Sequence, residues 1–339
     1  MIQYSSMNEM WQQLIAKLAR DGVKSASRNG KMRELFGWSG QLNALGVGRS
    51  ILTSKCRKLD PCFAGAELIW YLSGRDDAAF MCDYAPKYAS FANPPTRDGV
   101  VYGAYGARFY TNPGWQERVF SDDTLIGVSS QLEGVVHLLK KDPDSRQAVV
   151  ALWDSADLAG AIKGGTNDLP CTVCLQFRLR DNFLHASTYM RSNDAWLGTP
   201  YDVLNFTNIQ KVLAGRLECY VGTYSHSVGS MHIYESDLAK VQGGMVSIED
   251  CRGHYNSYDT EVAGNRIKLD QARWIIDMAK TGHPQKALQL IEEVGSSAMA
   301  CPVLESVAAC VGKWTKDPKS RMLTAGWQAA WDIKYGGES

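Results

Sequence analysis

The chain has 339 residues, of which 45% are apolar and 21% are charged, so it can fold around a large hydrophobic core. Lysine plus arginine and aspartate plus glutamate both total 36, so there is no net positive field to hold a nucleic acid polymer. No run reaches the roughly 18 apolar residues of a membrane helix, and the first residues do not resemble a signal peptide, so we expect no membrane contact.

The first part of the chain predicts two helices and two irregular regions. Apolar residues recur at helical spacing over residues 7–21, which indicates an amphipathic helix. A buried helix is expected over residues 61–74, ending at a glycine. Residues 22–30 are polar and are predicted to form a loop. Residues 83–118 mix proline, glycine and aromatic residues without a period, so we expect loops around a cleft there.

The middle of the chain predicts a sheet with associated helices. A helix is expected over residues 124–141, and a buried strand over residues 146–153. Residues 171–180 and 183–190 are expected to be two further strands of the same sheet, joined by a short turn. A buried helix over residues 202–216 follows.

The last part of the chain has a wholly helical pattern. Candidate helices lie near residues 268–280, 284–295, 302–314 and 319–334. We therefore predict a main domain over residues 1–260 and a helical C-terminal extension over residues 261–339.

Cys171 follows a proline at the start of a predicted strand and is the first candidate reactive group. A free thiol is most often a buried structural residue. Cys174 could join it in a redox or metal-binding pair, although an offset of three places the two side chains on opposite faces of a strand. Alternatively Cys171 is a nucleophile, because a nearby arginine such as Arg191 would lower the pKa of the thiol. We predict no metal site.

The cysteine count bears on the compartment. Nine irregularly spaced cysteines favour reduced thiols over a disulfide framework, which predicts a cytoplasmic location.

Several polar side chains are candidate contacts for a phosphorylated ligand. A guanidinium group can bind a phosphate dianion through two hydrogen bonds. Arg28, Arg146 and Arg191 are therefore candidates, although each could equally be a solvated surface residue. His232 and Tyr234 share one face if their segment is a strand, and together they could hold a sugar hydroxyl or form an ordinary core pair.

Nine short blocks in order give the chain a resemblance to the thymidylate synthase superfamily from about residue 8 to residue 240. The blocks are Arg28-Asn29-Gly30, Leu52-Thr53-Ser54-Lys55, Ala66-Glu67-Leu68-Ile69-Trp70-Tyr71-Leu72-Ser73-Gly74, Val101-Tyr102-Gly103, Lys141-Asp142-Pro143-Asp144-Ser145-Arg146, Pro170-Cys171, Arg191-Ser192-x-Asp194, Gly198-x-Pro200 and His232-Ile233-Tyr234.

The resemblance implies an α+β fold, with a large twisted mixed β-sheet that helices cover on one face. It also implies a homodimer with sheets packed together and active sites shared between subunits. The implied ligands are a pyrimidine nucleoside monophosphate and 5,10-methylenetetrahydrofolate as co-substrate. The helical C-terminal extension is additional to this fold.

The resemblance also implies roles by position. Cys171 resembles the thiolate that adds to pyrimidine C6, Glu67 the buried carboxylate that moves protons through water, and Tyr102 the group near the C5 proton. The implied phosphate ligands are Arg28 and Arg191, with Arg146 supplied by the partner subunit, and Ser192 is a further implied substrate contact. The implied ribose contacts are His232 and Tyr234, and the implied folate contacts are Asp194 and Lys55.

One departure from the family pattern concerns the base. Asp202 stands where a thymidylate synthase has the asparagine that binds uracil. Uracil offers an N3–H donor and an O4 acceptor, whereas cytosine offers an N3 acceptor and an N4 amino donor. A protonated aspartate complements both cytosine positions, and mispairing two buried groups costs on the order of 2–6 kcal/mol. Asp202 therefore predicts a cytidylate substrate and the deoxycytidylate hydroxymethylase branch of the superfamily.

Other departures concern the cleft and the phosphate. Cys82 and Ala85 occupy the places of a tryptophan pair that shields an intermediate from water, so water becomes a more accessible acceptor, unless Tyr84 or Tyr88 compensates. The chain end lacks the apolar carboxylate terminus that closes over folate. A histidine is replaced by Thr172, and the second arginine of an Arg pair by Gln147.

The favoured function is therefore 5-hydroxymethylation of a cytidylate, dCMP by preference, with methylenetetrahydrofolate and water. CMP in place of dCMP, methylation of dCMP with release of dihydrofolate, and a catalytically inactive nucleotide-binding homologue stay open. The joint presence of Cys171, Glu67 and Tyr102 argues against the inactive homologue. A phage gene acting in a host cytoplasm is compatible with this function.

Overall fold

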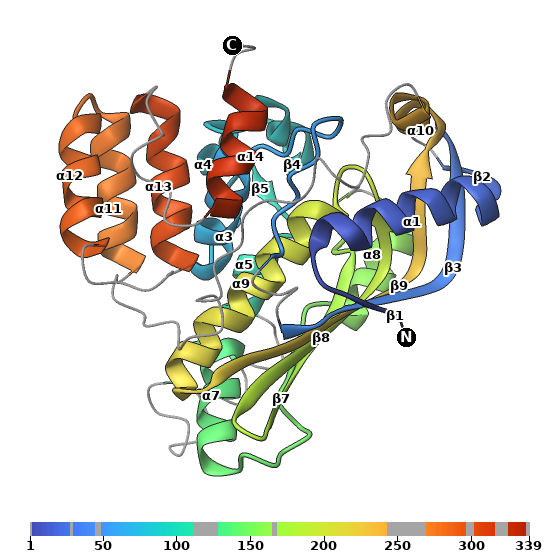
Figure 1. Cartoon of the computed structure of the whole chain (residues 1–339), viewed down its shortest axis with the longest axis horizontal. Coiled ribbons are helices and arrows are strands. Elements are labelled where there is room, and N and C mark those ends of the chain that lie inside the picture. The colour runs from blue at the N-terminus through green and yellow to red at the C-terminus, as the bar shows by residue number, and fades with distance from the viewer. Residues whose placement is uncertain are drawn as a thin grey trace.

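The computed structural model describes residues 2–27, 30–44, 49–111, 128–164, 168–242, 269–295, 302–315 and 325–336. These residues form an α+β architecture, which confirms the predicted fold class (Figure 1). The large sheet contains β1 (Ile2–Tyr4), β2 (Val23–Ser27), β3 (Gly30–Leu42), β6 (Val149–Ala151), β7 (Thr172–Arg180), β8 (Phe183–Asp194) and β9 (Tyr220–Tyr234), and a small sheet contains β4 (Ala92–Asn93) and β5 (Val100–Val101).

The described residues also form α-helices and one 3₁₀ helix. They are α1 (Met7–Asp21), α3 (Pro61–Leu72), α4 (Ala78–Cys82), the 3₁₀ helix η1 (Pro86–Phe91), α5 (Tyr105–Thr111), α7 (Gln131–Lys141), α8 (Ser155–Lys163), α9 (Thr199–Leu217), α10 (Glu235–Gln242), α11 (Leu269–Lys280), α12 (Pro284–Gly295), α13 (Pro302–Thr315) and α14 (Ala325–Tyr335).

The strand order in the large sheet is β1-β3-β9-β8-β7-β6, with β2 paired to β3. Strands β8 and β9 are parallel, and α9 connects them as a crossover helix. Strands β7 and β8 form a hairpin, and both residues of its turn, Asp181 and Asn182, have positive φ, as a tight turn of this kind requires. The hairpin brings the start of β7 beside the end of β8, where the Arg191 N–H donates to the Cys171 carbonyl at 2.8 Å.

Alternation along the strands gives the sheet one buried face. Leu175 and Phe177 on β7 and Met190 on β8 are buried, whereas Gln176 is half-buried and Tyr189 is exposed. Helices α7 and α9 pack against this sheet, and α1 packs beside β3 (Figure 1). The alternate residues leave the opposite face partly exposed within the described residues.

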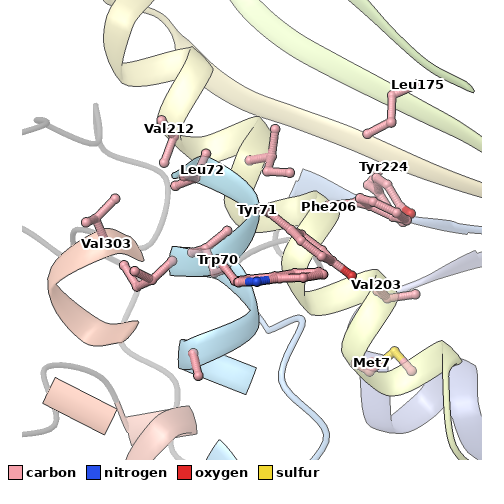
Figure 2. Close-up of a cluster of buried hydrophobic side chains, with 14 of the residues drawn as sticks. Met7, Trp70, Tyr71, Leu72, Leu175, Val203, Phe206, Val212, Tyr224 and Val303 are labelled. Atoms are coloured by element: carbon pink, nitrogen blue, oxygen red, sulfur yellow. The ribbon is translucent and has the colours of Figure 1, made fainter. Parts of the chain in front are cut away.

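Helix α3 is buried on almost every side: each of its residues except Phe63 is buried. A helix that is apolar all round needs partners on more than one side. Figure 2 shows Trp70 and Tyr71 of α3 directed toward Phe206 of α9, with the sheet beyond, and Val303 of α13 near the other side.

The C-terminal helices supply that second partner. Helix α13 packs along α3, α11 packs against both α12 and α13, and α14 contacts α3. Residues of α11 to α13 belong to the same hydrophobic cluster as α3. The four predicted C-terminal helices are present, with the described part of the last one beginning at Ala325. The division at residue 260 stays a prediction.

The predicted loop over residues 22–30 is wrong. Residues Val23–Ser27 form β2, which pairs antiparallel with β3, and β3 begins at Gly30. Nearly all of β2 is exposed because the strand lies at the sheet edge. An edge strand exposed on both faces has no apolar alternation for a sequence pattern to detect.

The region 83–118 was expected to be loops around a cleft. Within its described part, residues 83–111, it also contains η1, β4, β5 and α5. These elements are too short to show a period. The expectation that this region borders a cleft is confirmed, because residues between Tyr84 and Tyr105 line a cavity of about 490 Å³.

The remaining helix and strand predictions hold with shifted ends. The first helix has its predicted bounds, and the strand predicted over residues 146–153 shortens to β6. The sequence pattern missed the short helices α4, α8 and α10, the short strand β1, the long strand β3, and β9 before residue 230. Among the described residues, no helix combines the length and apolarity needed to span a membrane.

The contact between α3 and α13 yields a stability prediction. A Cβ at Gly65 would lie 2.6 Å from the Ser306 carbonyl oxygen and 3.1 Å from the Ala309 Cβ. Gly65→Ala should therefore lower the free energy of unfolding by about 1–3 kcal/mol, since the two backbones must separate. Urea unfolding measures the change.

Gly160→Ala in α8 is the matched control, because the nearest atom to its new Cβ would be the Leu169 Cδ2 at 3.9 Å. Alanine should be neutral there or stabilise by up to about 1 kcal/mol. If both substitutions changed the free energy of unfolding equally, the close approach of α3 and α13 at Gly65 would not require a glycine.

Candidate active site

A cavity of about 490 Å³ lies where α3, the segment before β4, the start of β7 and the start of α9 meet. Its lining residues are Arg57, Asp60, Phe63, Glu67, Trp70, Tyr71, Tyr84, Ala85, Tyr88, Phe91, Val101, Gly103, Ala104, Tyr105, Asp168, Leu169, Pro170, Cys171, Leu197, Gly198, Tyr201 and Asp202. Four of these are carboxylic acids, and one of the described lining residues, Arg57, is a cation.

Cys171 lines the cavity at the start of β7, where Arg191 holds the chain in place. The Arg191 Nε donates to the Pro170 carbonyl at 3.0 Å, and its Nη2 donates to the Leu169 carbonyl at 3.1 Å and lies 3.8 Å from the Cys171 Sγ. The predicted proximity of the two residues is confirmed. Burial raises the pKa of the thiol above its ordinary value, and the Arg191 charge opposes that rise. Arg191 therefore lowers the pKa as expected but does not outweigh burial.

Glu67 is buried in α3 and points toward α9. Its carboxylate accepts a hydrogen bond from the Asn205 Nδ2 at 2.7 Å. Burial raises the pKa of Glu67 to about 8, with a further rise from the charge of Asp202. A carboxyl with this pKa is mostly protonated at neutral pH and can donate a proton or a hydrogen bond.

Asp202 lies one turn before Asn205 on α9, in the first turn of that helix. Its Oδ2 accepts from the Asn193 Nδ2 at 2.6 Å, and the Thr199 hydroxyl donates to the Asn193 Oδ1, which orients the amide. Burial raises the pKa of Asp202 to about 7, and the hydrogen bond from Asn193 opposes that rise. Near neutral pH, Asp202 can therefore hold a proton or release it.

The structure places Tyr102 and Tyr105 differently. Tyr102 is 41% exposed, its ring lies under the Arg108 guanidinium at 5.1 Å, and it is not among the cavity-lining residues. Tyr105 lines the cavity, and its hydroxyl accepts from the Thr172 N–H at 3.1 Å. Burial raises the pKa of the Tyr105 hydroxyl, and the charges of Asp202 and Cys171 raise it further. The Tyr-Gly pair at 102–103 recurs at 105–106, and that repeat is the sequence signal that could have identified Tyr105.

Asp168 is a cavity residue that the sequence analysis did not single out. It precedes Cys171 by three positions, and its Oδ2 accepts from the Gly103 N–H at 2.9 Å. A Cβ at Gly103 would lie 3.0 Å from this Oδ2, so glycine permits the close approach. Burial raises the pKa of Asp168, and Gly103, Arg108 and Arg191 oppose the rise.

The candidate phosphate and ribose contacts are spread around the sheet. Arg28 lies outside the described residues. Arg146 is exposed before β6, and its carbonyl accepts from the Gln176 Nε2 at 2.9 Å. Ser192 is half-buried on β8, two residues before that strand ends. None of the described ones lines the cavity.

His232 and Tyr234 lie on β9 with ring centroids 5.5 Å apart. His232 is buried, and its Nδ1 has no hydrogen-bond partner among the described residues. The Tyr234 hydroxyl lies 3.2 Å from the Ser27 hydroxyl. The two residues share a strand face as expected, but their predicted role in ribose binding stays a prediction.

The two candidate folate contacts lie outside the cavity. Asp194 accepts from the backbone N–H groups of Trp196 and Leu197 at 2.7 and 2.9 Å, which closes the turn before α9. Lys55 is exposed. Nearer the cavity, Arg57 donates to the Trp196 carbonyl at 2.5 Å. The roles of Asp194 and Lys55 in folate binding stay predictions. Arg57 is a cation in the cavity wall that the sequence analysis missed.

The wall formed by residues 84–91 is aromatic although the tryptophan pair is absent. Ala85, Tyr84, Tyr88 and Phe91 line the cavity, whereas Cys82 does not. The Tyr88 ring packs edge-on against Trp70 at 5.7 Å. The Tyr84 ring packs edge-on against the Trp314 ring of α13, with ring centroids 5.5 Å apart. The C-terminal helices therefore buttress this wall.

The arrangement suits addition to a small planar ring. One wall presents the Cys171 thiol, and another presents Glu67 and Asp202, whose elevated pKa values allow proton transfer near neutrality. Tyr105 also lines the cavity, and its pKa is raised by burial and by the charges of Asp202 and Cys171. No group of three potential metal ligands occurs among the residues that the structure describes.

Comparison with known proteins yields one family. The thymidylate synthase family profile matches residues 9–249. A deoxyuridylate hydroxymethyltransferase of Bacillus phage SP01 is 30% identical over 235 residues, which are 69% of this chain and 58% of the phage protein. A thymidylate synthase of Buchnera aphidicola subsp. Baizongia pistaciae (strain Bp) is 28% identical over 234 residues, which are 68% of this chain and 80% of that protein. The match thus spans less than two thirds of the phage protein.

The elevated pKa of Glu67 predicts a pH dependence of stability. The pKa of an exposed glutamate is 4.5, and that of Glu67 in the folded protein is about 8. Between these values the unfolded chain loses its proton and the folded chain keeps it, so stability falls as the pH rises through this window and levels off above pH 8.

Glu67→Gln removes this titration while keeping an acceptor for Asn205. Urea unfolding of the variant should therefore show a fall between pH 5 and pH 8 that is smaller than the wild-type fall by a few kcal/mol. Identical falls in the two proteins would contradict the presence of a protonated Glu67.

Proposed function

Because the chain belongs to the thymidylate synthase family, we propose that it hydroxymethylates a cytidylate at C5, with dCMP as the preferred nucleotide. The reaction consumes methylenetetrahydrofolate and water, and it releases tetrahydrofolate. The family profile and the two relatives support one-carbon transfer to a pyrimidine nucleotide. The choice of base and of product is our inference from the cavity.

The observation that carries the proposal is the buried, readily protonated Asp202 in the cavity wall. Cytosine needs a donor opposite N3 and an acceptor opposite its N4 amino group. A protonated carboxyl supplies both, and the pKa of about 7 makes that form available near neutral pH. Asn193 holds one carboxyl oxygen and so fixes the plane of the group. Because Asn193 donates to Oδ2, the proton lies on the other carboxyl oxygen; with that oxygen opposite N3, the uracil N3–H would face the carboxyl proton, so this arrangement favours cytosine.

The phage relative supports the hydroxymethyl product. Its name specifies hydroxymethyl transfer to deoxyuridylate, so the matched part of this chain resembles a protein that makes the same product type on a different base. Water must then reach the activated carbon. Ala85 leaves room in the wall, although Tyr84 and Tyr88 remain there.

The cavity has a fitting place for the folate co-substrate that the family uses. The Phe63 and Tyr201 rings lie edge to face at 4.8 Å, beside Tyr88, and could pack against a flat pterin. The Arg57 guanidinium lies 5.4 Å from the Tyr201 ring and could pair with a carboxylate of the co-substrate. When bound, methylenetetrahydrofolate supplies the one-carbon unit.

The residues of this chain then have distinct tasks. The Cys171 thiolate adds to C6 of the base, which turns C5 into a carbon nucleophile. Asp202 holds the base edge and neutralises charge that develops on the ring. Glu67 exchanges protons with the base, and Tyr105 takes the place next to C5 that the sequence had suggested for Tyr102. The Arg191 guanidinium, 3.8 Å from the thiol, favours the thiolate.

Two features support a homodimer as part of this proposal. One face of the sheet is incompletely covered within the described residues, with Tyr189 46% exposed there. Arg146 is exposed and does not reach the cavity of its own chain. A partner subunit that packs sheet to sheet would cover this face, and Arg146 could reach the cavity of that partner. The cytoplasmic location stays a prediction.

Cys171→Ser should abolish turnover, because an alcohol is scarcely ionised at neutral pH, while the dissociation constant for dCMP changes little. Tritium release from dCMP labelled at C5 measures the loss. Cys174→Ser is the matched control, because Cys174 lies three residues further on, in β7, and does not line the cavity; this variant should keep near wild-type activity. Exchange at the wild-type rate in Cys171→Ser would remove this thiol from the mechanism.

Asp202→Asn should shift base preference from cytosine toward uracil. Asparagine complements uracil when its oxygen accepts from N3–H and its NH2 donates to O4; an amide in this orientation faces the cytosine N4 donor with its own donor and N3 with its own acceptor, at about 1–3 kcal/mol. The ratio of kcat/KM for dCMP to that for dUMP should therefore fall roughly 5- to 150-fold.

Mass spectrometry of the wild-type products from dCMP, CMP and dUMP tests the proposal itself. We expect 5-hydroxymethyl-dCMP without dihydrofolate. A methylated product with dihydrofolate would establish methylation instead, and an unchanged kcat/KM ratio in Asp202→Asn would refute the role of Asp202.

A further inference from the structure

Asp168 is a carboxylate in the cavity. Neither the addition of Cys171 to C6 nor the recognition of the base uses it. It lines the same cavity as Cys171 and lies three residues before it, on the segment that Arg191 holds. A buried carboxyl costs free energy unless it is compensated, and here the Gly103 N–H binds it at 2.9 Å. The loop is thus built to hold a carboxylate at this point of the wall.

The position of Asp168 differs from that of the other two buried carboxyls. Glu67 and Asp202 are both near α9, where each binds an asparagine side chain. Asp168 binds the backbone of the 101–105 segment and lies on the same wall as Cys171, three residues before it, whereas Asp202 lies on the α9 wall. A nucleotide attached to Cys171 therefore has Asp168 on the side of the thiol and Asp202 on the α9 side.

We propose that Asp168 is the general base that activates water for the hydroxymethylation step. This inference rests on the proposed function and assigns a catalytic residue to its second half. The step begins from a base that is bonded to Cys171 at C6 and has an exocyclic methylene group at C5, after tetrahydrofolate has left.

The step balances with water as the sole co-reactant. The water oxygen bonds to the methylene carbon while a water proton passes to Asp168, and the π electrons of the methylene double bond move into the ring. Those electrons then form the C5–C6 double bond as the C6–S bond breaks, and Cys171 leaves as a thiolate. The product has a hydroxymethyl group, and no carbon is reduced by an outside donor.

Electrostatics favour Asp168 over its neighbours for this role. The pKa of Glu67, about 8, leaves it protonated at neutral pH and unable to accept a second proton. Asp202 needs its own proton to bind cytosine. The Gly103 N–H and the charges of Arg108 and Arg191 favour the ionised form of Asp168, and burial opposes them, so the pKa lies above the ordinary value. A carboxylate base becomes more effective as its pKa rises toward the working pH.

Asp168→Asn tests the inference, because the amide oxygen can still accept from Gly103 while the side chain cannot take a proton. Formation of 5-hydroxymethyl-dCMP should fall by about 10²–10⁴-fold. In a single turnover, tritium release from C5 should stay close to the wild-type rate, since it precedes the attack of water. The dissociation constant for dCMP should also be unchanged.

A thiol trap adds a readout that a merely structural role would not change. A 2-mercaptoethanol thiolate needs no base to attack the methylene carbon, so Asp168→Asn should yield a thioether product in place of the alcohol. Asp154→Asn is the matched control, because Asp154 caps α8 outside the cavity and asparagine caps a helix equally well. That variant should give the wild-type ratio of alcohol to thioether.

The outcomes separate this inference from the proposed function. If wild type makes 5-hydroxymethyl-dCMP but Asp168→Asn makes it equally fast, Asp168 is not the base. Loss of tritium release together with product would also refute the assignment, because the residue would then act before the attack of water. A wild type that forms no hydroxymethyl product would refute the proposed function and this step with it.

Discussion

The burial of two carboxyl groups in the contact between α3 and α9 is the constraint on which the cavity depends. Burial and the charge of Asp202 raise the cost of ionising Glu67, burial raises that of Asp202, and each carboxyl is held by one asparagine amide. If the helices separated, water would reach both carboxyl groups, and their pKa values would return to the ordinary range. The packing of α3 therefore sets both the shape of the cavity and the protonation of its wall.

That packing involves the C-terminal helices as much as the sheet. Helix α3 is apolar on nearly all sides, so it requires α9 on one flank and α13 on another. Helix α14 also reaches the rim of the cavity, where the Tyr335 hydroxyl donates to the Asp60 carboxylate at 2.9 Å. Asp60 in turn caps the start of α3 through the Cys62 and Phe63 N–H groups. The extension thus stabilises the helix that presents Glu67.

The site also shows how one short segment can combine several tasks. Residues 168–171 present a carboxylate and a thiol within four positions, and Arg191 from the neighbouring strand binds the carbonyls between them. The β7–β8 hairpin makes this possible, since its tight turn returns the chain to the start of β7 with Arg191 in register. The thiol and its cation are thereby fixed by backbone geometry and not by flexible side chains alone.

The sequence by itself determined the α+β class, the helices with strong periodicity, the family and the candidates Cys171, Glu67 and Asp202, because apolar spacing and short motifs are local properties. Only the tertiary structure decided that Tyr105 lines the cavity in place of Tyr102, that Asp168 joins it, and that β2 is an edge strand. Each of these depends on contacts between segments distant in sequence. Spacing along a chain does not encode which side of a loop faces a cavity, or how far burial shifts a pKa.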